Sequence, residues 1–272
     1  EPGRGPRRLD ERFAGFGSPW AQLRGSAPGM SERLAALCAR LGLCSRSEAA
    51  RYIRLGLVAV DGQPVQNAAA VVSSSASVSL LPRGQRMQEN KVTIMLNKPM
   101  HYVSCRAAAG QPLARRLLIP ANRAATCRTR HDPRHLSKLD AVDILDEAAT
   151  GLLLFSQDGR VATRVATDLE KEFCVQVAGT LTSSQLAAFE AGLAAGGAAQ
   201  LVDAAEGSEV IEGSKLLRVV GRGHMTSQMI QQTCSVAGVR HVGIERRRVG
   251  SVSLGSLPSG QWTIVDSKDF LK

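Results

Sequence analysis

The sequence has no Cys-x-x-Cys pair and no run of the roughly 18 apolar residues that a membrane-spanning helix requires. Its six cysteines are scattered, which excludes a dense disulfide framework and predicts reduced, mostly buried thiols. Cys127, His131 and His135 are spaced by four, but Pro133 interrupts the helix that would align them and no fourth ligand is evident. We therefore expect these residues to bind neither a metal ion nor a cofactor, and we expect no membrane-spanning segment.

Acidic residues are outnumbered, with 24 Asp and Glu against 34 Lys and Arg and a formal net charge of +10. An Arg-heavy excess suits phosphate contacts, so nucleic acid is the leading class of partner. Net charge alone is weak evidence, since many basic proteins bind nothing in particular. The 272 residues, 44% of them hydrophobic, suffice for one large or two modest globular domains.

Residues 1–29 carry five Arg and three acids among Gly, Pro and Ser, with neither helical nor strand periodicity. We expect a basic flexible tail. Leaders that direct proteins to organelles are rich in Arg and Ser, and on this basis we expect a mitochondrial protein. Another organelle, the cytoplasm or a plain disordered extension would explain the composition equally well.

Residues 30–65 predict two short helices and a hairpin. Apolar residues recur at intervals of three and four through residues 30–41, and Gly42 ends that helix. Ser45-Arg46-Ser47-Glu48 is a capping box that opens the second helix. Asp61-Gly62, flanked by short apolar runs, is a two-residue hairpin signal.

This pattern, from Arg33 to Val65, resembles the S4 RNA-binding domain. In S4 domains the second helix and the hairpin face structured RNA, so the resemblance implies phosphate contacts from arginines of this region. A solvated helix face is the alternative. The residues concerned are Arg33, Arg40, Arg46, Arg51 and Arg54.

The next segments divide the chain. Ala70 to Leu81 predicts a strand, and residues 82–90, beginning with Pro-Arg-Gly, predict an interdomain linker. We therefore expect a tail at 1–29, an S4 domain at 30–81, the linker at 82–90 and a second domain at 91–272. That domain opens with a strand at 92–96, before Asn97-Lys98-Pro99 turns the chain.

An acid precedes the most apolar run of the chain. Leu152 to Phe155 predicts a buried strand, and Asp146 lies in the loop that feeds it. Gly151 gives the backbone room to bend, so this carboxylate can face a cleft. The alternative is an ordinary loop acid or helix N-cap.

This segment resembles the Gly-Arg-Leu-Asp-x-x-Ser/Thr-x-Gly-Leu-Leu signature of the RsuA/RluB/RluE/RluF group of ribosomal RNA pseudouridine synthases. Asp146 and Gly151 fall in register, whereas Asp143 and Ile144 stand where the family has Gly and Arg. Asp140 and Asp143 precede Asp146 at intervals of three, but the spacing to Gly151 selects Asp146. The resemblance implies that Asp146 is the nucleophile of a reaction that needs no cofactor.

Two further segments resemble motifs of the same family. Lys171 to Val177 resembles its Lys-x-Tyr strand, with Phe173 in place of the Tyr. Phe173 would keep the ring that packs on the target base and lose the hydroxyl, or else be an ordinary core aromatic, and Lys171 would be a charge partner of Asp146. Gln231 and Gln232 stand at the two Arg positions of the family's RNA-binding helix.

Two Arg-rich stretches complete the expected RNA surface. Residues 106–134 contain only Asp132 as an acid, and we expect Arg115 and Arg116 there to contact RNA. We expect the same of Arg246 and Arg247 in the closing strands. A solvated surface loop and a solvated charge run are the respective alternatives.

The resemblance covers roughly Arg33 to Trp262 and implies an α+β protein, with a small S4 domain before a larger domain on a mostly antiparallel sheet. Asp146 is present, but the preceding Arg, the Tyr hydroxyl and the basic helix are not. We therefore expect a protein that binds ribosomal RNA, in the form of the large-subunit precursor, with weak or no catalysis. We expect it to act in assembly of the mitochondrial large ribosomal subunit, with ribosomal proteins or assembly factors as possible partners. A working pseudouridine synthase is the alternative.

Overall fold

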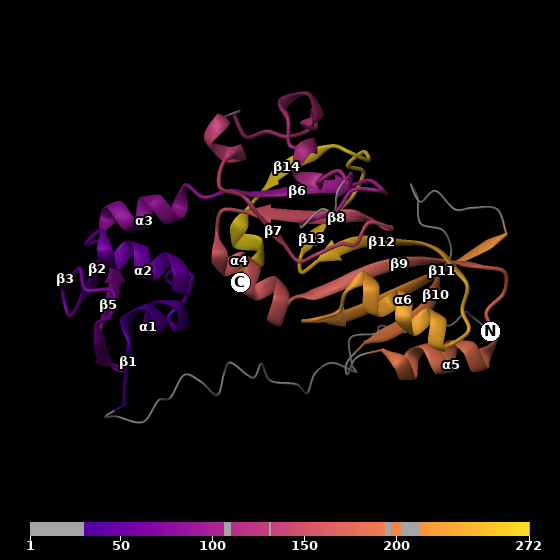
Figure 1. The fold of residues 1–272 in the computed structure, drawn as a ribbon, viewed down its shortest axis with the longest axis horizontal. Helices are drawn as coiled ribbons and strands as arrows, with labels where there is room; N and C mark the ends of the chain where they lie inside the picture. The colour runs from indigo at the N-terminus through magenta and orange to yellow at the C-terminus, as the bar shows by residue number, and fades with distance from the viewer. Residues whose placement is uncertain (1–29, 106–109, 131, 194–196, 203–212, 272) are drawn as a thin grey trace, which may run out of the picture.

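The computed structural model describes residues 30–105, 110–130, 132–193, 197–202 and 213–271. A small N-terminal body, indigo to purple in Figure 1, lies beside a larger body built on one long sheet. The tail expected at 1–29 and part of the Arg-rich stretch 106–134 lie outside the described residues. The C-terminus lies at the junction of the two bodies (Figure 1).

The N-terminal body combines short helices with two small antiparallel sheets, ordered β1-β4 and β3-β2-β5. Its elements are β1 (Ser31–Arg33), α1 (Leu34–Arg40), α2 (Arg46–Arg54), β2 (Val58–Val60), β3 (Gln63–Val65), β4 (Val71–Ser73), β5 (Val78–Leu80) and α3 (Pro82–Glu89).

Local signals correctly placed α2 and the hairpin. Ser45 accepts from the backbone N–H of Glu48, whose carboxylate accepts in return from the Ser45 N–H. Asp61 and Gly62 both have positive φ, at 48° and 82°, as a two-residue hairpin turn between right-handed strands requires. Tyr52 and its apolar neighbours on α2 fill the core of this body.

Three expectations for this region were wrong in detail. The first helix begins only at Leu34, because residues 31–33 pair with β4. The segment expected as one strand forms β4 and β5. Residues 82–89, expected as a linker, form helix α3, which starts with Pro82 and packs Gly84 against Leu57.

The larger body is a nine-stranded sheet in the order β10-β11-β9-β12-β8-β6-β14, with β7 on β8 and β13 on β12. Among the described strands, β8 and β12 pair parallel and the other pairs are antiparallel, as expected. Its strands are β6 (Thr93–Lys98), β7 (Asp140–Val142), β8 (Ala149–Ser156), β9 (Glu170–Ala178), β10 (Ala198–Val202), β11 (Ser214–Arg222), β12 (His241–Val249), β13 (Val252–Ser253) and β14 (Trp262–Val265).

Helices cover both faces of this sheet. Helices α5 (Ser183–Gly192) and α6 (Ser227–Val236) lie side by side along β9 to β11 in Figure 1. Helix α4 (Gly159–Thr167) and the 3₁₀ turn η6 (Ser267–Phe270) cover the other face. The described residues also form the 3₁₀ turns η3 (Ala114–Leu117), η4 (Pro120–Asn122) and η5 (Pro133–Leu136).

Strand β8 is buried on both faces and passes very close to β12. Leu153 and Phe155 enter the core under α5 and α6, whereas Leu152 and Leu154 enter the core under α4. Gly151 has φ +94°, and a Cβ at this position would lie 2.4 Å from the carbonyl oxygen of Arg246. Glycine at this position therefore permits the close approach of β12 that brings Arg246 into the core.

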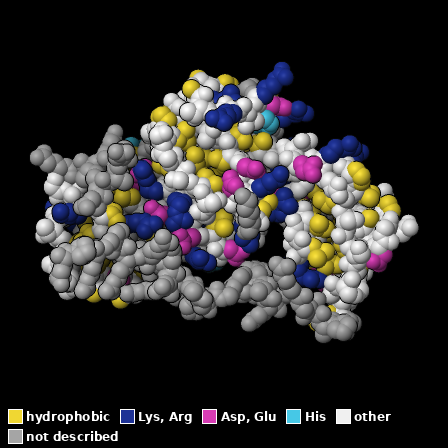
Figure 2. Space-filling view, turned by 180° about the vertical axis from the view of Figure 1, so that it is seen from behind, with side chains coloured by type: hydrophobic (Ala, Val, Ile, Leu, Met, Phe, Trp, Pro, Cys, Tyr) yellow, Lys and Arg dark blue, Asp and Glu magenta, His cyan; other side chains and the backbone are white. Residues whose placement is uncertain are grey.

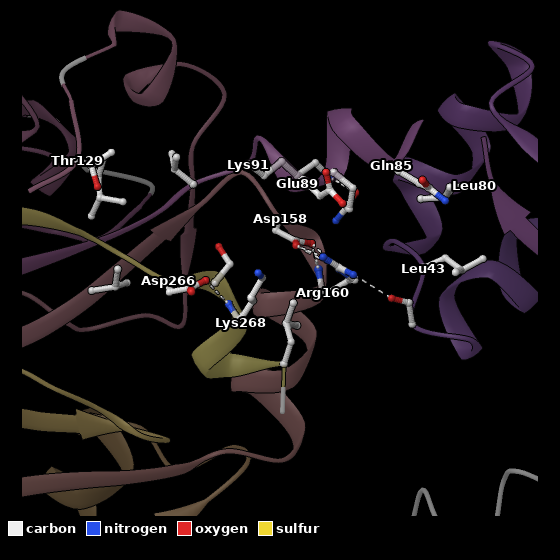
Figure 3. A pocket seen from close by; sticks show the side chains of 17 residues that line it. Leu43, Leu80, Gln85, Glu89, Lys91, Thr129, Asp158, Arg160, Asp266 and Lys268 are labelled. Atoms are coloured by element: carbon white, nitrogen blue, oxygen red, sulfur yellow. Dashed lines mark hydrogen bonds and ion pairs between the residues drawn. The ribbon is translucent and has the colours of Figure 1, made fainter. Parts of the chain in front are cut away.

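The two bodies share a polar junction. The Glu48 carboxylate forms an ion pair with Lys91 and lies 3.4 Å from the backbone N of Gly159 at the start of α4. Arg160 donates to the carbonyl oxygen of Gly42 at 3.0 Å. A cavity of about 560 Å³ opens beside these contacts, with Arg160 and Lys91 at its edge (Figure 3).

Candidate active site and RNA-binding surface

Asp146 lies in the β7–β8 loop, and its carboxylate faces the N-terminal half of α6. Oδ1 accepts from the backbone N–H of Ala149 at 2.9 Å. Oδ2 accepts from Ser227 Oγ at 2.7 Å and from Gln231 Nε2 at 3.3 Å. The residue is half-buried. All three donors are neutral, so the carboxylate is oriented by hydrogen bonds rather than by a salt bridge among the described residues.

Asp143, three residues earlier, takes the cations instead. Its Oδ2 lies 2.6 Å from Arg246 Nη1 and 2.8 Å from Lys171 Nζ. Both cationic side chains are fully buried. Burial lowers the pKa of Lys171 and of Arg246, and the Asp143 charge opposes that effect. Lys171, expected as a charge partner of Asp146, is therefore paired with a different acid.

Phe173 does not face a cleft. Its ring is fully buried in the core under α5 and α6, and the Arg246 guanidinium lies 5.9 Å from the ring centroid. The core-aromatic alternative therefore describes this position, because a ring without exposed surface cannot stack on a base. Arg246 is also 0% exposed and donates Nε to the Leu152 carbonyl at 2.7 Å, so it does not reach the surface where we expected a phosphate contact.

A third buried cation lies close to the same loop. Lys98 Nζ donates to the carbonyl oxygens of Tyr102 at 2.7 Å and Pro99 at 3.1 Å. Burial lowers its pKa to about 8, opposed by the charges of Asp146 and Glu147. Lys98 thus contributes positive potential near Asp146 while its ammonium group is held by backbone oxygens.

Two apolar side chains are exposed in the segments that flank Asp146. Ile144, at the position where the resemblance led us to expect Arg, is exposed, as is Met229 on α6. Gln232 is exposed on the same helix, whereas Gln231 contacts Asp146. The helix α6 contains no charged residue. The helix α6 therefore offers hydrogen bonds to phosphate but no charged side chain.

The arginines expected to contact RNA lie on the surface of the N-terminal body. All five expected residues, Arg33, Arg40, Arg46, Arg51 and Arg54, are exposed. Arg40 forms an ion pair with Glu32 and also donates to the Ser74 carbonyl at 3.0 Å, so its charge is partly satisfied. Arg51 lies 5.5 Å from the Tyr52 ring centroid. Arg46, Arg51 and Arg54 all belong to α2.

The expected arginines of the larger body divide into two groups. Arg115 and Arg116 are exposed residues of η3, and Arg115 also donates to the Leu139 carbonyl at 2.9 Å. Arg247 is half-buried and pairs with Glu245 at 3.0 Å. On the visible face of this body in Figure 2, basic and acidic side chains are interspersed.

Strand arginines near Arg247 are neutralised in the same way. Arg248 bridges Glu170 at 2.5 Å and Glu172 at 3.1 Å, and Arg218 pairs with Glu172 at 2.7 Å. These contacts, together with burial, which acts in the opposite direction, leave the pKa of Glu172 below its ordinary value. The outer face of β9 is thus a self-compensated ionic network.

The described residues contain no cluster of three His, Cys, Asp or Glu that could hold a metal ion, and within them no helix could cross a bilayer. The junction cavity does not include Asp146 among its lining residues. We therefore take the Asp146 loop, rather than the junction cavity, as the candidate active site.

Three site residues were missed by sequence reasoning. Ser227 contacts Asp146, Ser104 accepts from the Leu145 N–H at 3.0 Å and donates to the Leu145 carbonyl, and Asp143 holds the two buried cations. The local signal at Asp143 is that the resembled signature has Gly there. The backbone of Asp143 is left-handed, with φ 60°, a conformation that glycine adopts readily. The two serines lie 41 and 81 residues from the contacts they make, and nothing local marks them.

Comparisons with known proteins agree with this architecture. The model of the S4 domain matches residues 32–78. Ribosomal large subunit pseudouridine synthase B of Vibrio cholerae is 28% identical over 257 residues, covering 88% of this chain and 73% of that protein. The protein of the same name from Escherichia coli strain K12 is 28% identical over 258 residues, covering 87% and 80%.

A solved structure described as a pseudouridylate synthase also aligns with this chain. Its TM-score is 0.51 with 21% sequence identity, and the alignment covers 88% of this chain and 98% of that one. At this identity the likeness concerns the fold. It confirms the expected order of a small N-terminal domain followed by an α+β domain on a mostly antiparallel sheet.

Proposed function

This chain carries an S4 domain and is homologous to the RluB/RsuA-type ribosomal large subunit pseudouridine synthases, and from that premise we propose that it binds large-subunit ribosomal RNA with weak or no catalysis. The exposed arginines of α2 supply the electrostatic docking surface. The Asp146 loop lies in the larger body, where an extruded uridine would have to enter for chemistry.

The observation that carries this proposal is the environment of Asp146. A carboxylate that attacks a uridine must stay ionised in the complex with polyanionic RNA, which a contacting cation would favour. Among the described residues, the three groups that contact it are neutral, and Lys171 and Arg246 are engaged by Asp143. Loss of a contribution of a few kcal/mol slows a reaction by orders of magnitude, so binding can persist without useful turnover.

A second function, active isomerisation of uridine to pseudouridine, is supported by the position of Asp146 itself. The residue is half-buried and lies beside the N-terminal half of α6, five residues before Gly151. Lys98 adds positive potential without contacting it. In this alternative Asp146 is the nucleophile, and Ser227 and Gln231 orient it.

The finer parts of the proposal concern place and partners. We propose a mitochondrial role in assembly of the large ribosomal subunit, with a precursor RNA and assembly factors or ribosomal proteins as partners. Support for the compartment comes from the Arg- and Ser-bearing composition of residues 1–29 alone. Imaging of the full chain fused to a fluorescent protein tests it, and exclusion from mitochondria would refute that part.

The deciding experiment maps pseudouridine across ribosomal RNA in cells depleted of this protein and rescued with the native chain or with Asp146→Ala. The proposal expects every site to persist on depletion, large-subunit assembly to fail, and both chains to restore it. A site that disappears and returns only with the native chain would establish the synthase instead.

A further inference from the structure

Asp143 joins the two loops that build the Asp146 site. The first is the β7–β8 loop, which carries both acids. The second is the β11–α6 loop, which leads into Ser227 and Gln231. Lys171 binds Asp143 with its ammonium group and donates to the carbonyls of Gly223 at 2.6 Å and Met225 at 3.3 Å in the second loop.

The backbone at Asp143 is adapted to this contact. Its φ of 60° is left-handed, a conformation that costs a non-glycine residue free energy and persists only when other contacts compensate. The compensation is visible, because the carboxylate meets two cations that have no exposed surface. Arg246 links the same carboxylate to β8 through the Leu152 carbonyl.

We propose that Asp143 is a positioning residue, which sets the Asp146 carboxylate in register with its partners on α6 by joining the two loops through Lys171. The proposal deepens the function proposed above and rests on Asp146 being the functional acid. Asp143 acts through Lys171 and the backbone, and contacts no substrate.

If Asp143 and Lys171 join the two loops, a change in one loop should loosen the other loop. Asp143→Asn keeps the size of the side chain and removes the charge, and Lys171→Met keeps its length and removes the ammonium group. Asp143→Asn should speed amide exchange about tenfold in residues 223–229, which Asp143 does not touch. Lys171→Met should do the same in residues 144–149, which it reaches only through Asp143. Because both changes break one link, the double variant should be no faster than the faster single variant.

Hydrogen–deuterium exchange on the full chain, followed by mass spectrometry, measures this. Asp140→Asn is the matched control, since it removes an exposed acid from the adjacent strand β7 and should leave both loops unchanged. The proposal is overturned if each variant affects only its own loop, or if the two effects multiply in the double variant. Should Asp143→Asn fail to fold, Lys171→Met alone decides through residues 144–149.

A parallel measurement of RNA affinity separates this proposal from the function on which it rests. Asp143→Asn should bind large-subunit RNA within about twofold of the native chain, because the α2 arginines are untouched. If the native chain itself shows no affinity, the proposed function fails while the exchange result still decides the role of Asp143.

Discussion

The cations of helix α2 and those near the Asp146 site are used in opposite ways. On α2 of the S4 domain, Arg46, Arg51 and Arg54 project from a surface helix. In the larger body, Lys98, Lys171 and Arg246 have no exposed surface. The first group is available to phosphate, and the second compensates internal acids and carbonyl oxygens.

This difference means that the net charge of +10 does not measure the RNA-binding surface. A buried cation without its counter-ion is strongly destabilising, whereas an exposed arginine affects stability little. Substitution of a buried cation of the larger body should therefore lower stability. Substitution of an exposed arginine of α2 should lower RNA affinity, and variants can test this difference directly.

Arg246→Met should give the largest effect. It leaves Asp143 with one cation and removes the donor to Leu152, so we expect a loss of about 3 kcal/mol in the free energy of unfolding. Urea denaturation measures it. Arg247→Met, on the neighbouring half-buried residue paired with Glu245, is the control and should cost less than about 1 kcal/mol. Equal small losses would contradict the structural role of Arg246.

Changing Arg46, Arg51 and Arg54 together to Ala should give the next largest effect, on binding. We expect affinity for structured large-subunit RNA to fall by about 30-fold and the slope of log affinity against log salt to lessen by roughly 2. Stability should change little, since these side chains are exposed. Filter binding across a salt series measures both quantities.

The matched control for this triple variant is Arg218, Arg247 and Arg248 changed together to Ala. These three arginines are already paired with glutamates, so affinity should fall less than about threefold. If this set costs as much as the α2 set, the S4 domain is not the principal docking surface.

Local patterns were sufficient to predict helix α2, the β2–β3 hairpin and the loop that carries Asp146. A capping box, an Asp-Gly turn and the spacing to Gly151 act within a few residues, so the sequence displays them directly. The helix α3 was missed because its formation depends on packing. Its opening Pro-Arg-Gly reads as a loop, yet Gly84 fits against Leu57, and Gln88 accepts from the Tyr52 hydroxyl at 3.1 Å.

The roles of the site residues were harder to predict because ion pairs depend on tertiary placement. Arg246 lies in a run of three arginines that looks like a surface patch, but the first of them points into the core and the next two form ion pairs. Phe173 alternates inward on β9, and only the packing of α5 and α6 over it shows that its ring is covered. Sequence could propose both residues but not decide their exposure.

Gln231→Arg sharpens the comparison by placing a cation at Asp146. The native amide already lies 3.3 Å from the carboxylate, and a guanidinium can replace it with a charge-assisted contact. We expect pseudouridine formation on large-subunit RNA to rise about tenfold, which corresponds to about 1.4 kcal/mol. Gln232→Arg, on the exposed position beside it, should raise RNA affinity without this change in rate. No rise for Gln231→Arg would show that the missing contact cation does not limit turnover.

The smallest effect is expected at the junction between the two bodies, in the pH dependence of stability. Burial would raise the pKa of Glu48, but the Lys91 ammonium and hydrogen bonds from Ser45 hold it below the ordinary value of 4.5. A carboxyl whose folded-state pKa is depressed contributes stability above its unfolded pKa and loses it as pH falls through the folded value.

Glu48→Gln should therefore lower the free energy of unfolding by about 1 kcal/mol at pH 6 and by less at pH 3, since the native protein loses this contribution below pH 4.5. Denaturation at the two pH values measures the difference. Glu89→Gln, an exposed acid on the nearby α3, should change neither. If Glu48→Gln lowers the free energy of unfolding equally at both pH values, the loss comes from the poorer capping geometry of the amide and not from the missing charge. In that case the ion pair between Glu48 and Lys91 would contribute nothing to the stability of the junction.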